Sequence, residues 1–241
     1  MARLPERDGI ANSILLSLPP PTFQWIQPRL ESVELAKGDV IDRAGQPIER
    51  VYFVNRGLIS LIKTMHDGRT VEISAVGIEG VTDAHALFGL NRAALDTIVQ
   101  IPGDALRISY DTLKRLMADD KALHEVMERY SGFAIGQLAQ NAACNRLHSL
   151  EERCCRWLLM VHDSAISDTF PLTHEFLAMM LGVQRAGVSI AANTLQSAGL
   201  ITYRRGIVTI TNRFGLEDGS CECYGAMQEE LNKLFPPPKG A

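Results

Sequence analysis

The sequence predicts an α+β protein with three successive parts: an antiparallel barrel or sandwich of hairpins, one long helix, and a helix-turn-helix followed by a hairpin. Short apolar segments separated by turn residues occupy positions 31 to 108, as the strands of successive hairpins do. Positions 121 to 146 contain no proline and keep their apolar residues at helical spacing. We place the three parts at 1–118, 119–147 and 148–241.

The composition is that of a globular protein. With 46% hydrophobic and 22% charged residues, the 241-residue chain can bury a core. No apolar run approaches the roughly 20 residues that cross a bilayer, and the N-terminus lacks the apolar stretch of a secretion signal. The five scattered cysteines make a poor disulfide framework. We therefore expect a cytoplasmic protein with no membrane partner.

Glycine-containing turns separate the strands of the N-terminal part. Asn55-Arg56-Gly57 and Asp67-Gly68 are two such turns, because glycine adopts positive φ without steric cost. Asp67-Gly68 is the firmest of them and predicts a two-residue hairpin loop. The strands on either side are therefore expected to pair in an antiparallel sheet.

The long helix of the second part needs a partner along much of its length. A helix of about 25 residues is about 37 Å long, which exceeds the width of a small domain. We expect two copies of the chain to pair through it, and the alternative is a core helix of one large domain. The stripe that would mediate this pairing consists of Leu123, Val126, Met127, Tyr130, Phe133, Ala134, Leu138, Asn141 and Ala142.

Two short helices and a hairpin follow in the third part. Thr173 is placed to cap the first helix, and Gly182 ends it. The second helix turns Val188, Ala192 and Leu195 inward. The stretch 201–210 then forms a hairpin whose turn contains Arg204-Arg205-Gly206, so the third part is a winged helix-turn-helix.

The charge distribution favours a polyanionic partner for this third part. The chain carries a net charge of −4, but the segment from Pro171 to Arg213 has four arginines against one carboxylate, Glu175. Its net charge is +3, which leaves −7 for the remainder. A basic module on an acidic body is compatible with binding to nucleic acid.

The residue types on the second helix suit the major groove of double-stranded DNA. Arginine can bond both acceptors of guanine, and glutamine can pair with adenine. Side chains at a helix N-terminus or on a wing are suited to phosphates. An ordinary helical hairpin with solvated arginines is the alternative. The predicted DNA-binding residues are Thr173, Gln184, Arg185, Gly187, Ser189, Asn193, Arg204 and Arg205.

The chain resembles the Crp/Fnr superfamily, the cyclic-AMP receptor protein and fumarate–nitrate regulator type, over nearly its whole length. The strongest match is LTHEFLAMMLGVQRAGVSIAANTLQSAGLI, followed by the Arg-Arg-Gly turn. The resemblance implies an N-terminal β-roll sensor, a dimerisation helix, and a homodimeric transcription factor that binds a two-fold-symmetric operator and contacts RNA polymerase. Arg185 matches the first arginine of the family's recognition helix. Ala186 replaces its glutamate and Ile190 its second arginine, so the operator is expected to differ.

The sensor departs from the pattern of the family's cyclic-nucleotide-binding members. In those members, the nucleotide-binding segment has a glutamate that holds the ribose and an arginine that holds the phosphate. This sequence has Val81 at the glutamate position and Leu95-Asp96 where the arginine and the serine after it belong. We therefore expect no binding of cyclic AMP and leave the small-molecule effector unknown. Glu79 and Arg92 are the candidate effector-binding residues, although surface loop charges are the alternative.

The sequence points to no cofactor, metal or catalytic site. The family's iron–sulfur members carry a cysteine cluster mostly ahead of the β-roll, but the first cysteine here is Cys144. Cys221 and Cys223 form a short metal-like pair without a second pair at suitable spacing. His174-Glu175 begins a zinc-protease-like motif that lacks its second histidine. We expect no enzyme; a β-roll metalloprotein or a cyclic-nucleotide-binding-like interaction module without DNA binding is the alternative.

Overall fold

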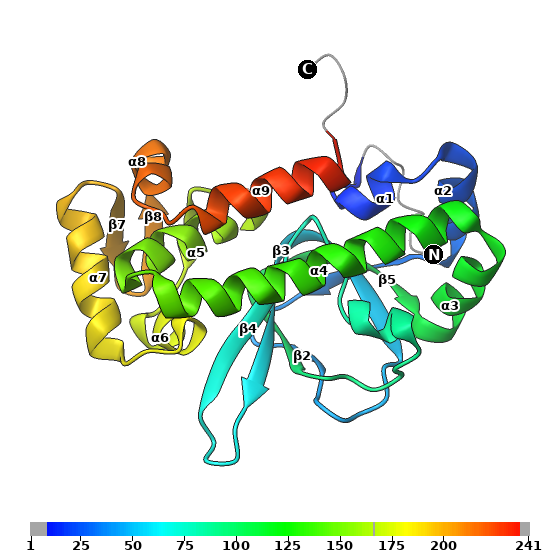
Figure 1. Ribbon diagram of the computed structural model, residues 1–241, viewed down its shortest axis with the longest axis horizontal. Helices are drawn as coiled ribbons and strands as arrows, with labels where there is room; N and C mark the ends of the chain where they lie inside the picture. The colour runs from blue at the N-terminus through cyan, green and yellow to red at the C-terminus, as the bar shows by residue number, and fades with distance from the viewer. Residues whose placement is uncertain (1–8, 166, 237–241) are drawn as a thin grey trace.

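The N-terminal half is built on an antiparallel sheet in which β3 and β5 are the central strands (Figure 1). The computed structural model describes residues 9–165 and 167–236. The sheet order is β1-β5-β3-β4, and β2 also pairs with β5. The strands are β1 (Glu31–Leu35), β2 (Val40–Asp42), β3 (Arg50–Thr64), β4 (Thr70–Val76) and β5 (Asp96–Ser109).

The two predicted turns have different outcomes. Gly68 has positive φ as expected, but the β3–β4 loop is longer than two residues, because Met65 donates its N–H to the carbonyl of Arg69 at 2.8 Å. The turn predicted at Asn55-Arg56-Gly57 is wrong, since these residues lie inside β3. There the register against β5 shifts, and a Cβ on Gly57 would lie 2.5 Å from the carbonyl oxygen of Ile101. This glycine permits a close backbone approach within a bulged strand.

Helices close the N-terminal core over the sheet. The main apolar core joins these helices to residues of the sheet and to the first half of α4. Asn12 Oδ1 accepts from the N–H of Leu15 and so caps α1, and the proline run ends α1 and begins α2. The elements are α1 (Ser13–Ser17), α2 (Pro20–Ile26), η2 (Gln27–Arg29), η3 (Ala84–Phe88), α3 (Tyr110–Asp119) and α4 (Lys121–Leu147).

Helix α4 has one buried face and one exposed apolar face. Leu123, Val126, Met127 and Tyr130 are buried in the chain's own core. The first half of the predicted dimer stripe is therefore wrong, because helical spacing alone does not distinguish a partner helix from the chain's own sheet. The second half of α4 leaves small and apolar residues in solvent, and two of them, Leu138 and Ala142, belong to the predicted stripe. The full exposed set is Gly132, Ile135, Gly136, Leu138, Ala139, Ala142 and Ala143.

The C-terminal part has the predicted winged-helix arrangement. Its sheet order is β6-β8-β7. Ser149 and Glu152 form a capping box at the start of α5, in which Ser149 Oγ accepts from the N–H of Glu152 and Glu152 Oε2 accepts from the N–H of Ser149. The elements are α5 (Leu150–Ala165), β6 (Thr169–Pro171), α6 (His174–Leu181), α7 (Arg185–Ser197), β7 (Ile201–Arg204), β8 (Ile207–Ile210), α8 (Arg213–Asp218) and α9 (Cys223–Leu234).

The two halves of the chain share a core. Apolar residues of β3, β4 and β5 cluster with the buried faces of α5, α6 and α7. The final helix α9 runs back along α4, and its end, Leu234 and Phe235, packs on the N-terminal core (Figure 1). None of the helices in the described part of the chain is long and apolar enough to cross a membrane.

A buried pair of carboxyl groups lies at the edge of the sheet. Asp42 ends β2 and lies beside Asp83, which precedes η3 with a positive φ of 54°. Burial, together with repulsion from Asp83 and Glu49, raises the pKa of Asp42 above its usual range, and His85 opposes this shift. Burial also raises the pKa of Asp83. The folded protein therefore retains protons here that the unfolded chain has lost.

This pair predicts a pH dependence of stability. The raised pKa values mean that its contribution is fully present below the unfolded pKa, near 4, and is lost as pH rises through the folded values. Asp42→Asn removes one ionisable partner, so the stability of the variant relative to wild type should increase between pH 5 and pH 8. Urea unfolding followed by circular dichroism at both pH values measures the difference. The exposed Asp111→Asn is the control, and an equal effect of Asp42→Asn at both pH values contradicts the prediction.

Candidate nucleic-acid interface

The N-terminus of α6 is capped as the sequence predicts. Thr173 Oγ1 accepts from the N–H of Phe176 at 3.2 Å, and the Thr173 side chain stays exposed. Gly182 ends the helix with φ +65°, and its N–H bonds to the carbonyls of Ala178 and Met179. The tight turn that follows directs the chain into α7.

Helix α7 buries one face and exposes the other. Val188, Ala192 and Leu195 are buried, as predicted. The helix begins at Arg185, and Gln184 is its N-cap residue. On the outer side, Gln184, Arg185 and Asn193 are exposed, whereas Gly187 and Ser189 are half-buried; the exposed apolar residues beside them are Ala186 and Ile190.

Ser189 is engaged inside the protein. Its hydroxyl lies 3.0 Å from His174 Nδ1 and donates to the carbonyl of Arg185. The His174 ring stacks on Tyr203 of β7 with 4.2 Å between centroids. Burial, and then the charge of Arg185, lower the pKa of His174, which therefore stays neutral near pH 7. His174 thus fixes α6, α7 and the wing together, a role that no sequence pattern indicates.

The wing places its cations beside the start of α6. Arg205 and Gly206 have φ values of 51° and 78° and form a two-residue turn between the paired Arg204 and Ile207. The carbonyl of Gly206 accepts from the N–H of Leu172 at 2.8 Å. Arg204, Arg205 and the α6 N-terminus therefore lie close together, and both arginine side chains are exposed.

The arginines of the C-terminal part differ in whether they form ion pairs. Arg213 pairs with Asp163 at 2.7 Å and with Glu217 at 2.8 Å, so it is neutralised within the protein. Within residues 9–165 and 167–236, Arg185, Arg204 and Arg205 form no ion pair. The basic surface consists of these three arginines.

The β3–β4 hairpin borders this surface. A cleft of about 950 Å³ lies between the hairpin and the helix-turn-helix. Thr173 and Gln184 line one side of the cleft, and Met65, Arg69 and Val71 line the other. Gln184 is therefore more recessed than Arg185, which lies outside the cleft lining.

The sensor contains a small apolar pocket at α4. Val81 and Leu95, the residues at the family's ribose and phosphate positions, both line this pocket of about 160 Å³. Its lining includes neither arginine nor lysine, while Asp83 contributes a carboxyl group. His85 also lines the pocket, but a phosphate there would find no guanidinium or ammonium partner.

The two candidate effector residues lie apart. Glu79 is buried beside α5 and α9, where its carboxylate accepts from the N–H of Gly77 at 2.9 Å and burial raises its pKa. Arg92 is exposed and donates to the carbonyl of Gly45 at 2.7 Å. None of the pockets found in the described part of the chain contains both residues.

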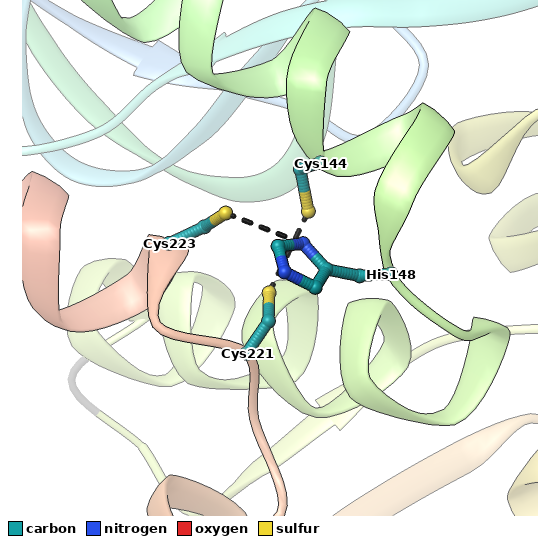
Figure 2. Close-up of side chains that lie close together, drawn as sticks. All are labelled: Cys144, His148, Cys221 and Cys223. Carbon is teal, nitrogen blue, oxygen red and sulfur yellow. Dashed lines mark hydrogen bonds between the residues drawn. The ribbon is translucent and has the colours of Figure 1, made fainter.

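A second group of side chains has the composition of a metal site. Cys144, His148, Cys221 and Cys223 converge where α4, α5 and α9 meet (Figure 2). The sequence suggested only Cys221 and Cys223. Their partners are far away along the chain, but Cys144 and His148 are four residues apart, a spacing that places two ligands on one face of a helix and could have indicated them.

Comparison with known proteins identifies the two domains. Residues 32–120 match the cyclic nucleotide-binding domain, and residues 152–218 match the Crp-like helix-turn-helix domain. The chain is 22% identical over 207 residues to the CRP-like cAMP-activated global transcriptional regulator of Mycobacterium tuberculosis, covering 79% of this chain and 92% of that protein.

Solved structures share the fold. FixK2 from Bradyrhizobium japonicum superposes with a TM-score of 0.66 at 18% identity, covering 80% of this chain and 98% of that one. A putative Crp/Fnr regulator from Eubacterium rectale gives 0.65 at 18% identity, with 86% and 97% covered. The two domain matches occur in the order that the fold requires, on either side of the long helix. The chain belongs to the Crp/Fnr superfamily of transcriptional regulators.

Proposed function

We propose that this protein regulates transcription as a homodimer that binds a palindromic operator in double-stranded DNA. The observation that carries the proposal is the exposure of Arg185, Arg204 and Arg205, without ion pairs among the described residues, beside the N-terminus of α6. Helix α7 enters the major groove, and the wing and Thr173 contact the phosphates. The protein acts in the cytoplasm, and RNA polymerase is its further partner.

The exposed face of α7 determines which bases are read. Arg185 extends from the first turn and bonds the two acceptors of a guanine, while Gln184 pairs with adenine. Ala186 and Ile190 lie one turn apart, and their apolar surfaces suit the methyl group of thymine. Gly187 packs against α5, where a Cβ would lie 3.1 Å from Leu150 Cδ2, so its predicted DNA contact is replaced by a packing role. Asn193 lies one turn beyond Ile190, and Ser189 orients the helix through His174. The operator therefore differs from that of family members with a glutamate and a second arginine.

The exposed face of α4 supports pairing of two chains. Ile135 is 55% exposed and Leu138 is 38% exposed, on a helix surface that is otherwise small or apolar. Packing of this face against its symmetry mate removes it from water and places two α7 helices on one side of the dimer. Half-sites one helical turn apart match this symmetry.

The sensor, residues 1–118, responds to an unidentified signal and passes it through residues 119–147 to the DNA-binding part, residues 148–241. The Mycobacterium tuberculosis relative is named as cAMP-activated. In this chain, Val81 and Leu95 line the pocket and no arginine or lysine does, so a ligand with less charge than a cyclic nucleotide fits it better. Glu79 and Arg92 are too far apart in the fold to share one of the pockets described above.

Substitution of Arg185 tests base reading. Arg185→Ala should weaken operator binding by about 1–3 kcal/mol and remove the preference at one base pair in each half-site. Selection of bound fragments from a random duplex library supplies the operator, and fluorescence anisotropy with single-base variants measures the loss. Equal weakening on every sequence contradicts the base-reading role.

The wing provides the matched comparison for this test. The double variant Arg204→Ala/Arg205→Gly removes both charges, and glycine keeps the positive φ that position 205 requires. Binding should fall almost uniformly across sequences, with a shallower dependence of affinity on salt. Arg115→Ala, on the exposed side of α3, is the control and should leave both properties unchanged.

Substitution of Ile135 tests the dimer. Ile135→Asp places a charge in the paired surface, so the mass in solution should fall from twice the 26.5 kDa chain mass to that of one chain. Light scattering after size-exclusion chromatography measures it. Met65→Asp, at a hairpin tip where the side chain is 52% exposed, is the control. A wild-type protein that is monomeric at micromolar concentration contradicts the proposal.

Thermal unfolding tests the sensor pocket. Cyclic AMP should produce no saturable rise in melting temperature, because its phosphate would be buried without a guanidinium or ammonium partner. The Mycobacterium tuberculosis relative serves as the positive control. A saturable stabilisation of this protein by cyclic AMP would overturn the assignment of the pocket.

A further inference from the structure

Three cysteines and one histidine meet at the junction of the sensor and the DNA-binding part (Figure 2). Cys144 lies in the last turn of α4, and His148, one turn later, is the C-cap residue of that helix. Cys221 precedes α9 and Cys223 is its first residue. The chain thus returns after 77 residues to the place where α4 ends.

The spacing of the ligand atoms fits one tetrahedral metal ion. All four lie within 4.8 Å of one another. Cys144 Sγ is 3.5 Å from Cys221 Sγ, and Cys223 Sγ is 3.5 Å from His148 Nδ1. Zinc bonds of about 2.3 Å to sulfur and 2.0–2.1 Å to nitrogen place neighbouring tetrahedral ligands about 3.5–3.8 Å apart.

The histidine is already oriented for metal binding. His148 Nε2 lies 3.0 Å from the carboxylate of Glu222, which accepts its proton. Nδ1, on the other side of the ring, then presents its lone pair to the three sulfur atoms. A carboxylate behind the distal nitrogen is the usual support of a zinc-binding histidine. Gln140 Nε2 also donates to Cys223 Sγ at 2.9 Å, as an amide does to a thiolate.

The surrounding charges complement a thiolate-rich site. Arg153 and Arg156 are buried, and their positive charges act on Cys144. In the described residues neither forms an ion pair, and the Nε atoms of both lack a hydrogen-bond partner. One divalent cation with three thiolates has a net charge of −1, which complements these two guanidinium groups, of which Arg156 also interacts with the carboxyl group of Glu72.

We propose that Cys144, His148, Cys221 and Cys223 bind one divalent metal ion of the zinc class, which fastens α9 and the DNA-binding part to the end of α4. Thiolate and imidazole ligands select such a metal over magnesium or calcium. Four protein ligands close the coordination sphere, so the site is structural. Each thiol releases its proton when it binds. An iron–sulfur cluster would insert several atoms between the sulfurs and needs a wider spacing.

Cobalt titration of the full-length protein tests the site. The reduced, metal-free protein should bind one Co²⁺ per chain, with the intense visible absorption of a tetrahedral thiolate complex, and zinc should displace it. Absence of this absorption, or binding of more than one Co²⁺ per chain, overturns the proposal. The visible chromophore of an iron–sulfur cluster in protein purified without oxygen also overturns it.

Paired cysteine variants locate the metal. Cys221→Ala should abolish stoichiometric Co²⁺ binding and the zinc-dependent rise in melting temperature. Cys154→Ala is the matched control, because Cys154 is equally buried but lies outside the cluster. Glu222→Ala should raise the dissociation constant about 10- to 100-fold, because it removes the support of His148. Full Co²⁺ binding by folded Cys221→Ala contradicts the proposal. If Cys221→Ala fails to fold, Glu222→Ala and the wild-type stoichiometry decide, and an unchanged dissociation constant in Glu222→Ala then contradicts it.

Discussion

The burial of helix α5 is the interaction on which the arrangement of the two halves depends. Its residues from 153 to 159 are all buried between the sheet, α4 and the winged helix. Each fully buried apolar side chain in this core contributes about 1.5–3 kcal/mol. Trp157 adds a hydrogen bond from its indole N–H to Glu72 of β4 at 3.0 Å, and burial raises the pKa of that carboxyl group to about 7. Because α6 and α7 pack on α5, the position of the recognition helix follows from contacts made with the sensor.

In the proposed function, one part of the α7 surface reads bases and another part holds the helix in place. Arg185 makes no ion pair within the described chain, which leaves its charge available to DNA, whereas Ser189 and His174 are joined to each other and to Tyr203. A neutral His174 stacks on the wing without adding a charge next to Arg185. Substitution of His174 would therefore disturb the relative position of α7 and the wing, and would affect base contacts and phosphate contacts together.

The features that the sequence predicts are local ones. Thr173, Gly182 and the pair Ser149 and Glu152 act within one helical turn, so their residue types determine their structure. The sequence therefore predicts the fold and the exposed ends of α6 and α7. The sequence does not reveal features that depend on contacts between residues far apart along the chain. Gly57 resembles a turn glycine but allows β5 to approach β3, and the buried stripe of α4 faces the chain's own core. Cys144 and Cys221 meet only in the folded chain, because the whole DNA-binding part lies between them in sequence.

The position of the cysteine cluster explains what a metal ion would add to this fold. Only His148 and Ser149 separate α4 from α5, and the hydrogen bond from Asn141 of α4 to β4 acts one turn before Cys144. A link between residues 144 and 221 closes a loop of 77 residues, for which loop-closure entropy gives about 4–5 kcal/mol of stabilisation relative to the open unfolded chain. This exceeds what a few surface contacts of α9 supply. The metal would therefore stabilise the junction between the halves, next to α5, on which α7 and its Arg185 pack.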